Sequence, residues 1–263
     1  MKQRLKVVLL RGSSPRHIFV QSTLGKSLNI ELQVLEPLRT NSGRLIPMLK
    51  RSPATFFSRL TKHLLLKLKC WDQKEQQFFN CPPVKYKVVA GVNSQEAIDF
   101  LKFWQPDIIV AFGVPIIKSR TLDQAKIGAI NIHGGISPQY KGGNTIFWSL
   151  YNGEAELAGA TIHHMVKKVD SGSVLAKYYP PVNSGEGEFE VSCKTFKGVA
   201  LELLHLLNTI AQTGEFPSGE QQQGYSHLYL AKHRTLIKDI LGPLKIRKYM
   251  QDVNLPERIE RSY

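Results

Sequence analysis

Three polar side chains that suit acyl transfer to an amine occur within forty residues of one another: Asn131, His133 and Asp170. Asn131 and His133 are two positions apart at the end of an apolar run, so in a β-strand their side chains leave the same face of the sheet. The amide can donate to a developing oxyanion, and the imidazole can donate as well or carry a proton. The carboxylate can orient the imidazole or accept a proton from the amine. Each residue type alone is more often structural than catalytic, so the combination carries the prediction.

Short apolar runs alternate with amphipathic segments along most of the chain, which predicts a mostly parallel sheet wound on both faces by helices. We expect strands at residues 5–10, 30–35, 86–90, 107–112, 129–133, 160–165 and 173–179. A first helix should start at Pro15 after a Ser14 N-cap, and a second should run from a cap at Asn93 or Ser94 to Trp104. Further helices are expected at 144–151 and 189–213. Ligands of such folds bind beyond the carboxyl ends of the strands. Gly113 and residues 12–15 follow predicted strands, and His133 is the last residue of one, so all of them lie at this edge.

The chain of 263 residues fits one large α/β domain with a short extension. We assign residues 1–213 to a catalytic domain that carries a basic insertion at about 37–85, and residues 214–263 to a C-terminal extension. Within the extension, residues 225–230 resemble a short strand and 235–250 a basic helix.

The net charge of +14 is concentrated in the insertion, where eight lysines and arginines and no acidic residue lie between Glu36 and Asp72. Such a segment attracts phosphates, nucleic acid or an anionic membrane face, although a solvated helix surface is an equally good interpretation. Residues 56–71 within it have a one-sided leucine pattern (Leu60, Leu64, Leu68) that predicts an amphipathic helix.

Several classes of protein are disfavoured by composition. No apolar run is long enough to span a bilayer, and the short apolar segment at the N-terminus lacks a cleavage site, so we expect a first buried strand there rather than a signal peptide. The three cysteines (Cys70, Cys81, Cys193) have no metal-ligand spacing. We therefore expect a cytoplasmic protein without a metal site.

Four short motifs in a fixed order resemble the catalytic domain of the folate-dependent formyltransferases. They are NIH at 131–133, SPQYKG at 137–142, GATIH at 159–163 and DSG at 170–172. The resemblance implies a Rossmann-like formyltransferase fold, with Asn131, His133 and Asp170 as the catalytic residues. We assign no role to His163 and His164, which we expect to be structural.

The same resemblance implies N10-formyltetrahydrofolate as the formyl donor. The donor would lie against the segment at the end of the predicted strand 107–112, with its pteridine near the loop before Asp170. The residues expected to bind it are Phe112, Gly113, Val114, Pro115, Ile116, Ile117 and Val169. From the residues alone, an apolar loop at this sheet edge suits a flat heterocycle, but plain core packing explains each side chain equally well.

The acceptor is expected to be a small phosphorylated amine. Gly12, Ser13 and Ser14 precede a helix whose free N–H groups and positive dipole end suit an anion, and Arg16 lies in its first turn. In the resembling glycinamide ribonucleotide enzymes this loop holds the acceptor phosphate. We add Lys141, the basic residue of the Lys-Gly pair in the second motif, to the substrate-binding residues. An amino-sugar nucleotide is the acceptor that we favour.

Other acceptors and activities stay open. The chain lacks the Glu-His-x-x-x-Pro stretch that glycinamide ribonucleotide formyltransferases carry, and the extension is too short for the tRNA-binding domain of methionyl-tRNA formyltransferases. Binding of nucleic acid is therefore disfavoured, although the positive charge keeps tRNA open. A formyltetrahydrofolate hydrolase and a catalytically silent folate- or nucleotide-binding module are the remaining alternatives. The sequence also leaves a homodimer open.

Overall fold

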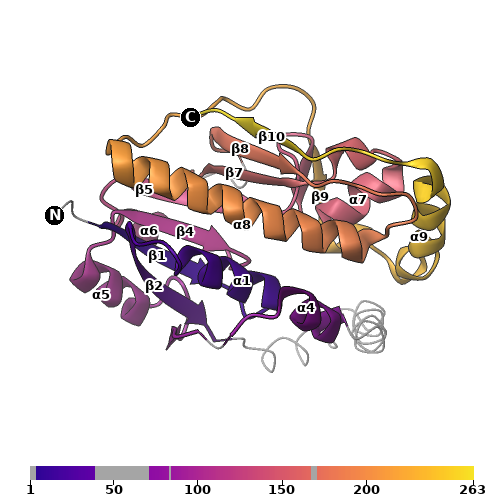
Figure 1. The fold of residues 1–263 in the computed structure, drawn as a ribbon. Helices are drawn as coiled ribbons and strands as arrows, with labels where there is room; N and C mark the ends of the chain where they lie inside the picture. Colours follow the sequence, from indigo (N-terminus) through magenta and orange to yellow (C-terminus); the bar gives the residue numbers. More distant parts are fainter. Residues whose placement is uncertain (1–3, 39–70, 83, 167–170) are drawn as a thin grey trace.

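An eight-stranded sheet runs through the protein, as a computed structural model shows for residues 4–38, 71–82, 84–166 and 171–263 (Figure 1). The strand order is β10-β8-β7-β5-β4-β1-β2-β3. Its strands are β1 (Leu5–Arg11), β2 (Ile30–Pro37), β3 (Lys87–Val89), β4 (Ile108–Phe112), β5 (Gly128–His133), β7 (Ala160–His164), β8 (Val174–Tyr179) and β10 (Arg258–Arg261). Neighbouring strands from β3 through β2, β1 and β4 to β5 pair in parallel. The pairs β5–β7, β7–β8 and β8–β10 are antiparallel. The predicted doubly wound, mostly parallel sheet is confirmed.

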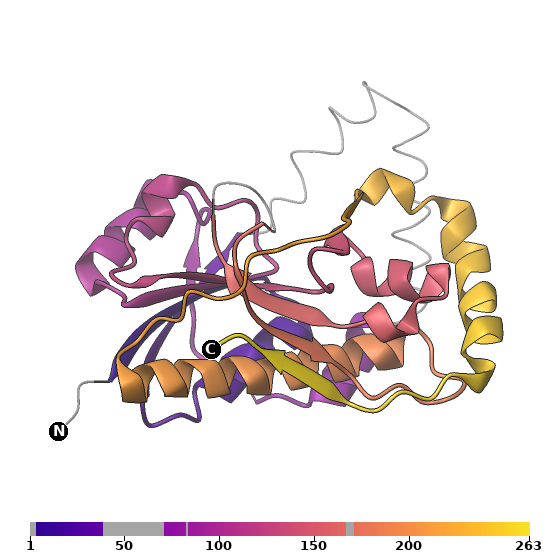
Figure 2. The same cartoon turned by 90° about the horizontal axis from the view of Figure 1, so that it is seen from above.

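Helices cover both faces of this sheet (Figures 1 and 2). The described helices are α1 (Pro15–Leu24), α4 (Trp71–Phe79), α5 (Gln95–Trp104), α6 (Ser119–Leu122), α7 (Thr145–Asn152), α8 (Glu188–Thr213) and α9 (Leu236–Tyr249). Single 3-10 turns occupy Ala155–Leu157, Ala231–His233 and Met250–Asp252. Among the described helices, none is long and apolar enough to cross a bilayer.

Two hydrophobic cores lie on the two faces because the side chains of each buried strand alternate. In β1, Val7 and Leu9 join the core that includes α1 and α8, whereas Val8 and Leu10 join the smaller core under α5. Strand β1 is buried on both faces, which explains why its sequence reads as a continuous apolar run.

The element starts predicted from capping residues are confirmed. Helix α1 begins at Pro15 with Ser14 as its N-cap, and the side chain of Ser94 accepts a hydrogen bond from the N–H of Ala97 at the start of α5. The predicted helix at 56–71 lies outside the described residues, apart from Trp71, which is the first residue of α4.

The C-terminal extension returns to the sheet. Strand β10 pairs antiparallel with β8 at the edge of the main sheet, and β9 (His227–Tyr229) pairs with β6 (Tyr140–Gly142) in a separate two-stranded sheet. Sequence patterning did not predict β10 or α4. Three of the four residues of β10 are charged and all are exposed, so it has none of the apolar alternation that marks a strand.

Candidate active site

The carboxyl ends of β1, β4 and β5 meet at one edge of the sheet. Arg11 pairs with Phe112 and Phe112 pairs with Ile132, so the residues that follow each strand lie side by side. Gly113 turns the chain at the end of β4 with φ of 66°, a left-handed conformation that favours glycine. The predicted position of Gly113 and His133 at this edge is confirmed.

Asn131 is oriented by a histidine on the neighbouring strand. The two residues are directly opposite each other in the antiparallel pair of β5 and β7, and Asn131 Nδ2 lies 3.1 Å from His163 Nε2. His163 Nδ1 lies 2.8 Å from the carbonyl oxygen of His164, which can only accept, so Nδ1 carries the proton and Nε2 of the neutral ring accepts from Asn131. One N–H of the Asn131 amide is used in this way, and an amide has two.

The side chain of His133 is buried and its tautomer is also set by a carbonyl. Its Nε2 lies 2.8 Å from the backbone oxygen of Tyr140 and must donate to it. In a neutral ring the lone pair then lies on Nδ1. The rings of His133 and His163 have centroids 6.4 Å apart, so both imidazoles and the Asn131 amide belong to one cluster.

The third motif, residues 159–163, supports this cluster from β7. Thr161 Oγ1 accepts from the N–H of Ser137 at 3.0 Å and donates to the carbonyl of Gly135 at 2.7 Å, which fixes the loop after β5. A Cβ on Gly135 would lie 2.7 Å from the Tyr140 oxygen and 2.8 Å from His133 Nε2. Only glycine therefore leaves room for the hydrogen bond that holds His133.

The predicted anion loop, Gly12 to Ser14, lies at the same edge and is stabilised by a hydrogen bond from a buried arginine. Arg11 donates to the carbonyl of Gly12 at 2.8 Å and forms an ion pair with Glu36 at 2.5 Å. The N–H of Ser14 donates to Nδ1 of His17 at 3.3 Å. One of the N–H groups that the sequence offered to an anion is thus engaged by the protein itself.

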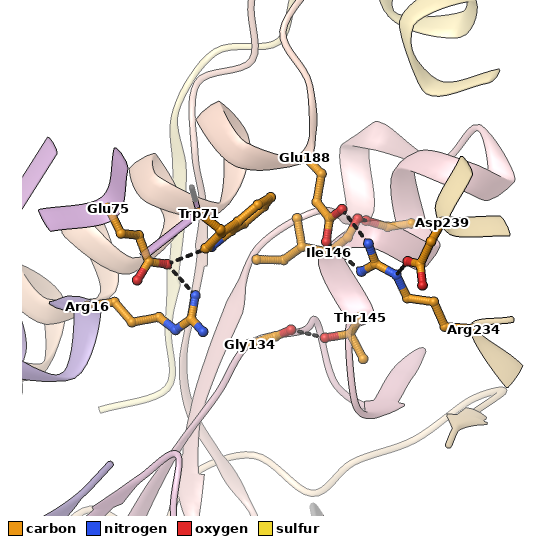
Figure 3. Close-up of polar contacts among 10 residues, drawn as sticks. Arg16, Trp71, Glu75, Gly134, Thr145, Ile146, Glu188, Arg234 and Asp239 are labelled. Carbon is orange, nitrogen blue, oxygen red and sulfur yellow. Dashed lines mark hydrogen bonds and ion pairs between the residues drawn. The ribbon is translucent and has the colours of Figure 1, made fainter. Parts of the chain in front are cut away.

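Arg16 points toward helix α4 and forms an ion pair with Glu75, whose side chain is almost fully buried (Figure 3). Trp71 Nε1 donates to the same carboxylate oxygen at 3.2 Å. Burial raises the pKa of Glu75 above its ordinary value, and the charge of Arg16 offsets only part of that rise. Sequence reasoning missed Glu75, because the contact joins positions 59 residues apart.

The predicted donor segment divides into buried and exposed residues. Phe112 and Ile117 are buried, and the ring of Phe112 contacts those of His17 at 4.4 Å and Phe196 at 5.4 Å between centroids. Gly113, Pro115 and Ile116 are exposed and Val114 is half-buried. Asn93 fixes the end of the segment, because its side chain donates to the carbonyl of Ile116 at 2.8 Å and accepts from the N–H of Lys118 at 2.7 Å.

Three further residues were predicted for the site, and one of them, Lys141, is among the described residues. Lys141 lies in β6, opposite Leu228 of β9. Val169 and Asp170 lie outside the described residues, so their roles stay predictions. The turn that follows Asp170 is tied to the site, since a Cβ on Gly172 would lie 1.9 Å from the carbonyl oxygen of His164, and Gln222 Nε2 donates to the Gly172 carbonyl at 2.7 Å.

Two of the cysteines belong to the part of the chain that the structure describes, and both are free thiols. Burial raises the pKa of Cys193 to about 12, which keeps it protonated and unreactive. No group of three or more candidate metal ligands occurs among the described residues.

Residues 69–198 match the family model described as "Formyl transferase". The matched range contains Asn131, His133, His163 and the strand edge described above. This part of the chain belongs to the formyl transferase family. The family predicted from the four motifs is therefore confirmed, and His163 of the third motif lies within hydrogen-bonding distance of Asn131 of the first.

Curated relatives resemble only part of this chain. A methionyl-tRNA formyltransferase from Lactiplantibacillus plantarum is 41% identical over 102 residues, which are 38% of this chain and 30% of the relative. The bifunctional polymyxin resistance protein ArnA from Wigglesworthia glossinidia brevipalpis is 34% identical over 119 residues, 45% of this chain and 17% of the relative. The chain thus covers less than a third of each of these two relatives.

Solved formyl transferase structures share the fold over most of the chain. A 4-N formyltransferase from Francisella tularensis is 13% identical, with a TM-score of 0.59 and 98% of both chains covered. A phosphoribosylglycinamide formyltransferase from Anaplasma phagocytophilum is 16% identical, with a TM-score of 0.58 over 87% of this chain and 98% of that one. A sugar N-formyltransferase from a Shewanella species is 15% identical, with a TM-score of 0.53 over 92% of this chain and 87% of that one. These likenesses confirm the predicted fold.

Proposed function

We propose that this chain transfers a formyl group from N10-formyltetrahydrofolate to the primary amine of a small acceptor. The observation that carries the proposal is the pair Asn131 and His133, which share one face at the carboxyl end of β5. Each side chain is held by a partner that fixes its hydrogen-bonding role, His163 for the amide and the Tyr140 carbonyl for the imidazole. The Asn131 amide is a donor fixed in this way and needs no reorganisation when negative charge develops, which is the requirement for stabilising an oxyanion. His133, whose Nε2–H donates to Tyr140, has its lone pair on Nδ1 and can take up a proton instead.

The proposed reaction is a direct transfer. The uncharged acceptor nitrogen attacks the formyl carbon, a carbon–nitrogen bond forms, and the carbonyl oxygen becomes an oxyanion that the Asn131 amide stabilises. The bond from the formyl carbon to N10 of the folate then breaks, and N10 takes up the proton that the amine releases. Asp170, by resemblance to the family, assists this proton transfer together with His133.

The donor is proposed to bind along the exposed part of the segment after β4. Gly113 to Ile116 provide an accessible, mainly apolar surface immediately beside Asn131 and His133, since Ala111 pairs with Asn131 in the sheet. Such a surface suits a flat heterocycle. Phe112 and Ile117 support this surface from the core.

An amino-sugar nucleotide is the acceptor that we propose, with glycinamide ribonucleotide as the second candidate. The loop that would hold a ribonucleotide phosphate is partly occupied by the protein, because the Ser14 N–H donates to His17 and Arg16 is paired with Glu75. A phosphate placed there would compete with a buried carboxylate for Arg16. An acceptor whose phosphates bind at another part of the edge avoids this competition.

The experiment measures consumption of N10-formyltetrahydrofolate with the purified chain and a panel of amino-sugar nucleotides, glycinamide ribonucleotide and charged initiator tRNA. Asn131→Ala and His133→Ala should each lower transfer by about a hundredfold or more. Thr209→Ala, a half-buried position of α8 whose hydroxyl donates only to the His205 carbonyl of the same helix, is the control and should act like the wild type. Near-normal transfer by His133→Ala would refute the mechanism, consumption without any acceptor would indicate the hydrolase, and no consumption would indicate a silent binding module.

A further inference from the structure

Helix α9 carries a row of large aliphatic side chains on its outer face. Ile237, Ile240, Leu241 and Leu244 are 68%, 54%, 55% and 66% exposed. Their spacing of three, four and seven positions places all four on one side of an α-helix. Solvent exposure of four neighbouring aliphatic residues costs free energy, so such a stripe in a folded protein is typical of an interaction surface.

The stripe is fixed in its outward orientation by the opposite face of α9. Gly242 and Ile246 are buried there, and a Cβ on Gly242 would lie 2.9 Å from the ring of Phe147 on α7. Three cations also lie over three aromatic rings of α7, in the pairs Arg234–Phe147 at 3.9 Å, Lys238–Trp148 at 4.8 Å and Lys245–Tyr151 at 4.0 Å. Rotation of α9 to bury the stripe would break all of these contacts.

Arg234 anchors the start of this arrangement just before the helix. Its guanidinium binds both oxygens of Glu188 on α8, at 2.7 and 2.9 Å, and Oδ1 of Asp239 at 2.6 Å (Figure 3). Asp239 is the only acidic residue between Ala231 and Met250, and it is buried and neutralised by this pair.

The remaining charge around the stripe is positive. Besides Arg234, which is paired with Glu188 and Asp239, five basic residues lie between Ala231 and Met250, namely Lys232, Lys238, Lys245, Arg247 and Lys248. Arg247 and Lys248 are exposed in the last turn of α9, one turn beyond Leu244. The surface therefore combines an aliphatic centre with basic flanks and no accessible carboxylate on α9. The whole chain, with a net charge of +14, adds to its attraction for anions.

We propose that α9 docks on the surface of an anionic lipid bilayer, with Ile237, Ile240, Leu241 and Leu244 in the boundary between headgroups and acyl chains. Aliphatic side chains at the centre and lysine or arginine at the border are the composition of helices that lie in a membrane interface. Nucleic acid would use the cations but gains nothing from four aliphatic residues. A second copy would bury the aliphatic residues, but it would bring like charges together, because this face carries no acidic residue.

Figures 1 and 2 both place α9 at the end of the molecule away from α5. Docking there is peripheral, in agreement with the lack of a membrane-crossing helix among the described residues. The inference concerns a surface distinct from Asn131 and His133, and it does not depend on the proposed function.

The test is co-sedimentation of the full chain with vesicles of phosphatidylcholine alone and of phosphatidylcholine mixed with phosphatidylglycerol. The wild type should bind the mixed vesicles and not the neutral ones, and added salt should weaken binding. Ile240→Ser with Leu244→Ser should weaken binding by about tenfold or more. Arg247→Gln with Lys248→Gln should weaken it by about fivefold for each charge removed.

The matched control removes the same kinds of side chain from α5. Phe103 is 86% exposed and Lys102 is exposed beside it, so Phe103→Ser with Lys102→Gln should bind like the wild type. Unchanged thermal unfolding and unchanged formyl transfer in solution would show that the α9 variants are folded. Equal binding by all variants, or no binding by the wild type, would overturn the proposal. Loss of a dimer or of tRNA binding in the α9 variants, without an effect on vesicles, would overturn it in favour of those partners.

Discussion

The ring of Tyr229 lies flat against the ring of Tyr140, with 5.5 Å between centroids and 9° between planes. Tyr229 belongs to β9 in the C-terminal extension, and the backbone oxygen of Tyr140 is the atom that binds His133 Nε2. The other stacking partner of Tyr229 is Trp148, at 4.8 Å, and its backbone oxygen accepts from the N–H of Gly143 at 2.8 Å. The extension therefore holds the loop that sets the tautomer of the proposed catalytic histidine.

Replacing Tyr229 should impair formyl transfer although its side chain is remote from the proposed chemistry. We expect Tyr229→Ala to lower kcat by about tenfold, because a displaced Tyr140 carbonyl no longer fixes His133. Tyr229→Phe keeps the stacking and loses only the hydrogen bond from Asn152, so it should retain most of the rate. The ¹⁵N chemical shifts of His133 report its tautomer and should change in Tyr229→Ala only. A wild-type spectrum together with wild-type kcat in that variant would contradict the coupling.

Removing His163 should impair the proposed oxyanion stabilisation by Asn131. We expect His163→Ala to lower kcat by about tenfold or more with little effect on the KM of the donor, because the amide loses the acceptor that orients it. His163→Gln supplies a side-chain oxygen and should restore part of the rate. The matched control is His164→Ala, since His164 lies on the other face of β7 and donates to the carbonyl of Pro217 at 2.7 Å. Equal losses in the His163 and His164 variants would reduce both to structural roles.

Removing the charge of Glu75 tests whether Arg16 binds the acceptor. Glu75→Gln leaves Arg16 without a buried counter-charge, and we expect the KM of glycinamide ribonucleotide, the second candidate acceptor, to fall by about threefold to tenfold, with little change for an amino-sugar nucleotide. The difference from wild type should shrink in mildly acidic buffer, because the raised pKa of Glu75 lets it take up a proton earlier than an ordinary carboxyl. Steady-state kinetics measure this, with Glu96→Gln from the exposed pair with Lys87 as the control. A constant KM for glycinamide ribonucleotide would exclude Arg16 from the acceptor site.

Glu202 should make the stability of the fold depend on pH. Its burial disfavours ionisation, but two hydrogen bonds from Arg261, both at 2.7 Å, and one from Tyr263 outweigh burial and leave its pKa below the ordinary value. A lowered pKa stabilises the folded state above the unfolded value of 4.5, and this contribution is lost as pH falls through the lower folded value. Because Arg261 is 42% exposed, we expect only about 1–2 kcal/mol from the pair.

Denaturant unfolding of Glu202→Gln measures that contribution. The free energy of unfolding should be lower than that of the wild type at neutral pH, and the two proteins should converge in acid below the folded pKa. Glu260→Gln is the matched control, since its carboxylate is 45% exposed and pairs with Arg258 at 3.4 Å and with Lys177 at 3.5 Å. If the difference in the free energy of unfolding at neutral pH persists unchanged in acid, altered side-chain packing rather than the lost charge of Glu202 causes it.

Local patterns in the sequence were sufficient for the parts of the fold that depend on local geometry. The period of a β-strand places Asn131 and His133 on one face wherever the strand lies, and the apolar runs of the parallel strands identify a sheet buried on both faces. The caps at Ser14 and Ser94 were predicted because a helix start depends on residues within one turn. The edge at which the strand ends meet followed from the rule that parallel strands share a direction.

By itself, then, the sequence determined the alternation of strands and helices, the motif order and the shared face of Asn131 and His133. Only the tertiary structure decided which groups hold these side chains, because each contact depends on the packing of distant elements. His163 lies opposite Asn131 through strand pairing, Glu75 meets Arg16 across 59 residues, and Tyr229 reaches Tyr140 from the C-terminal extension. No local periodicity marks such partners, since a histidine, a glutamate or a tyrosine on an exposed face has the same pattern as one that closes a site.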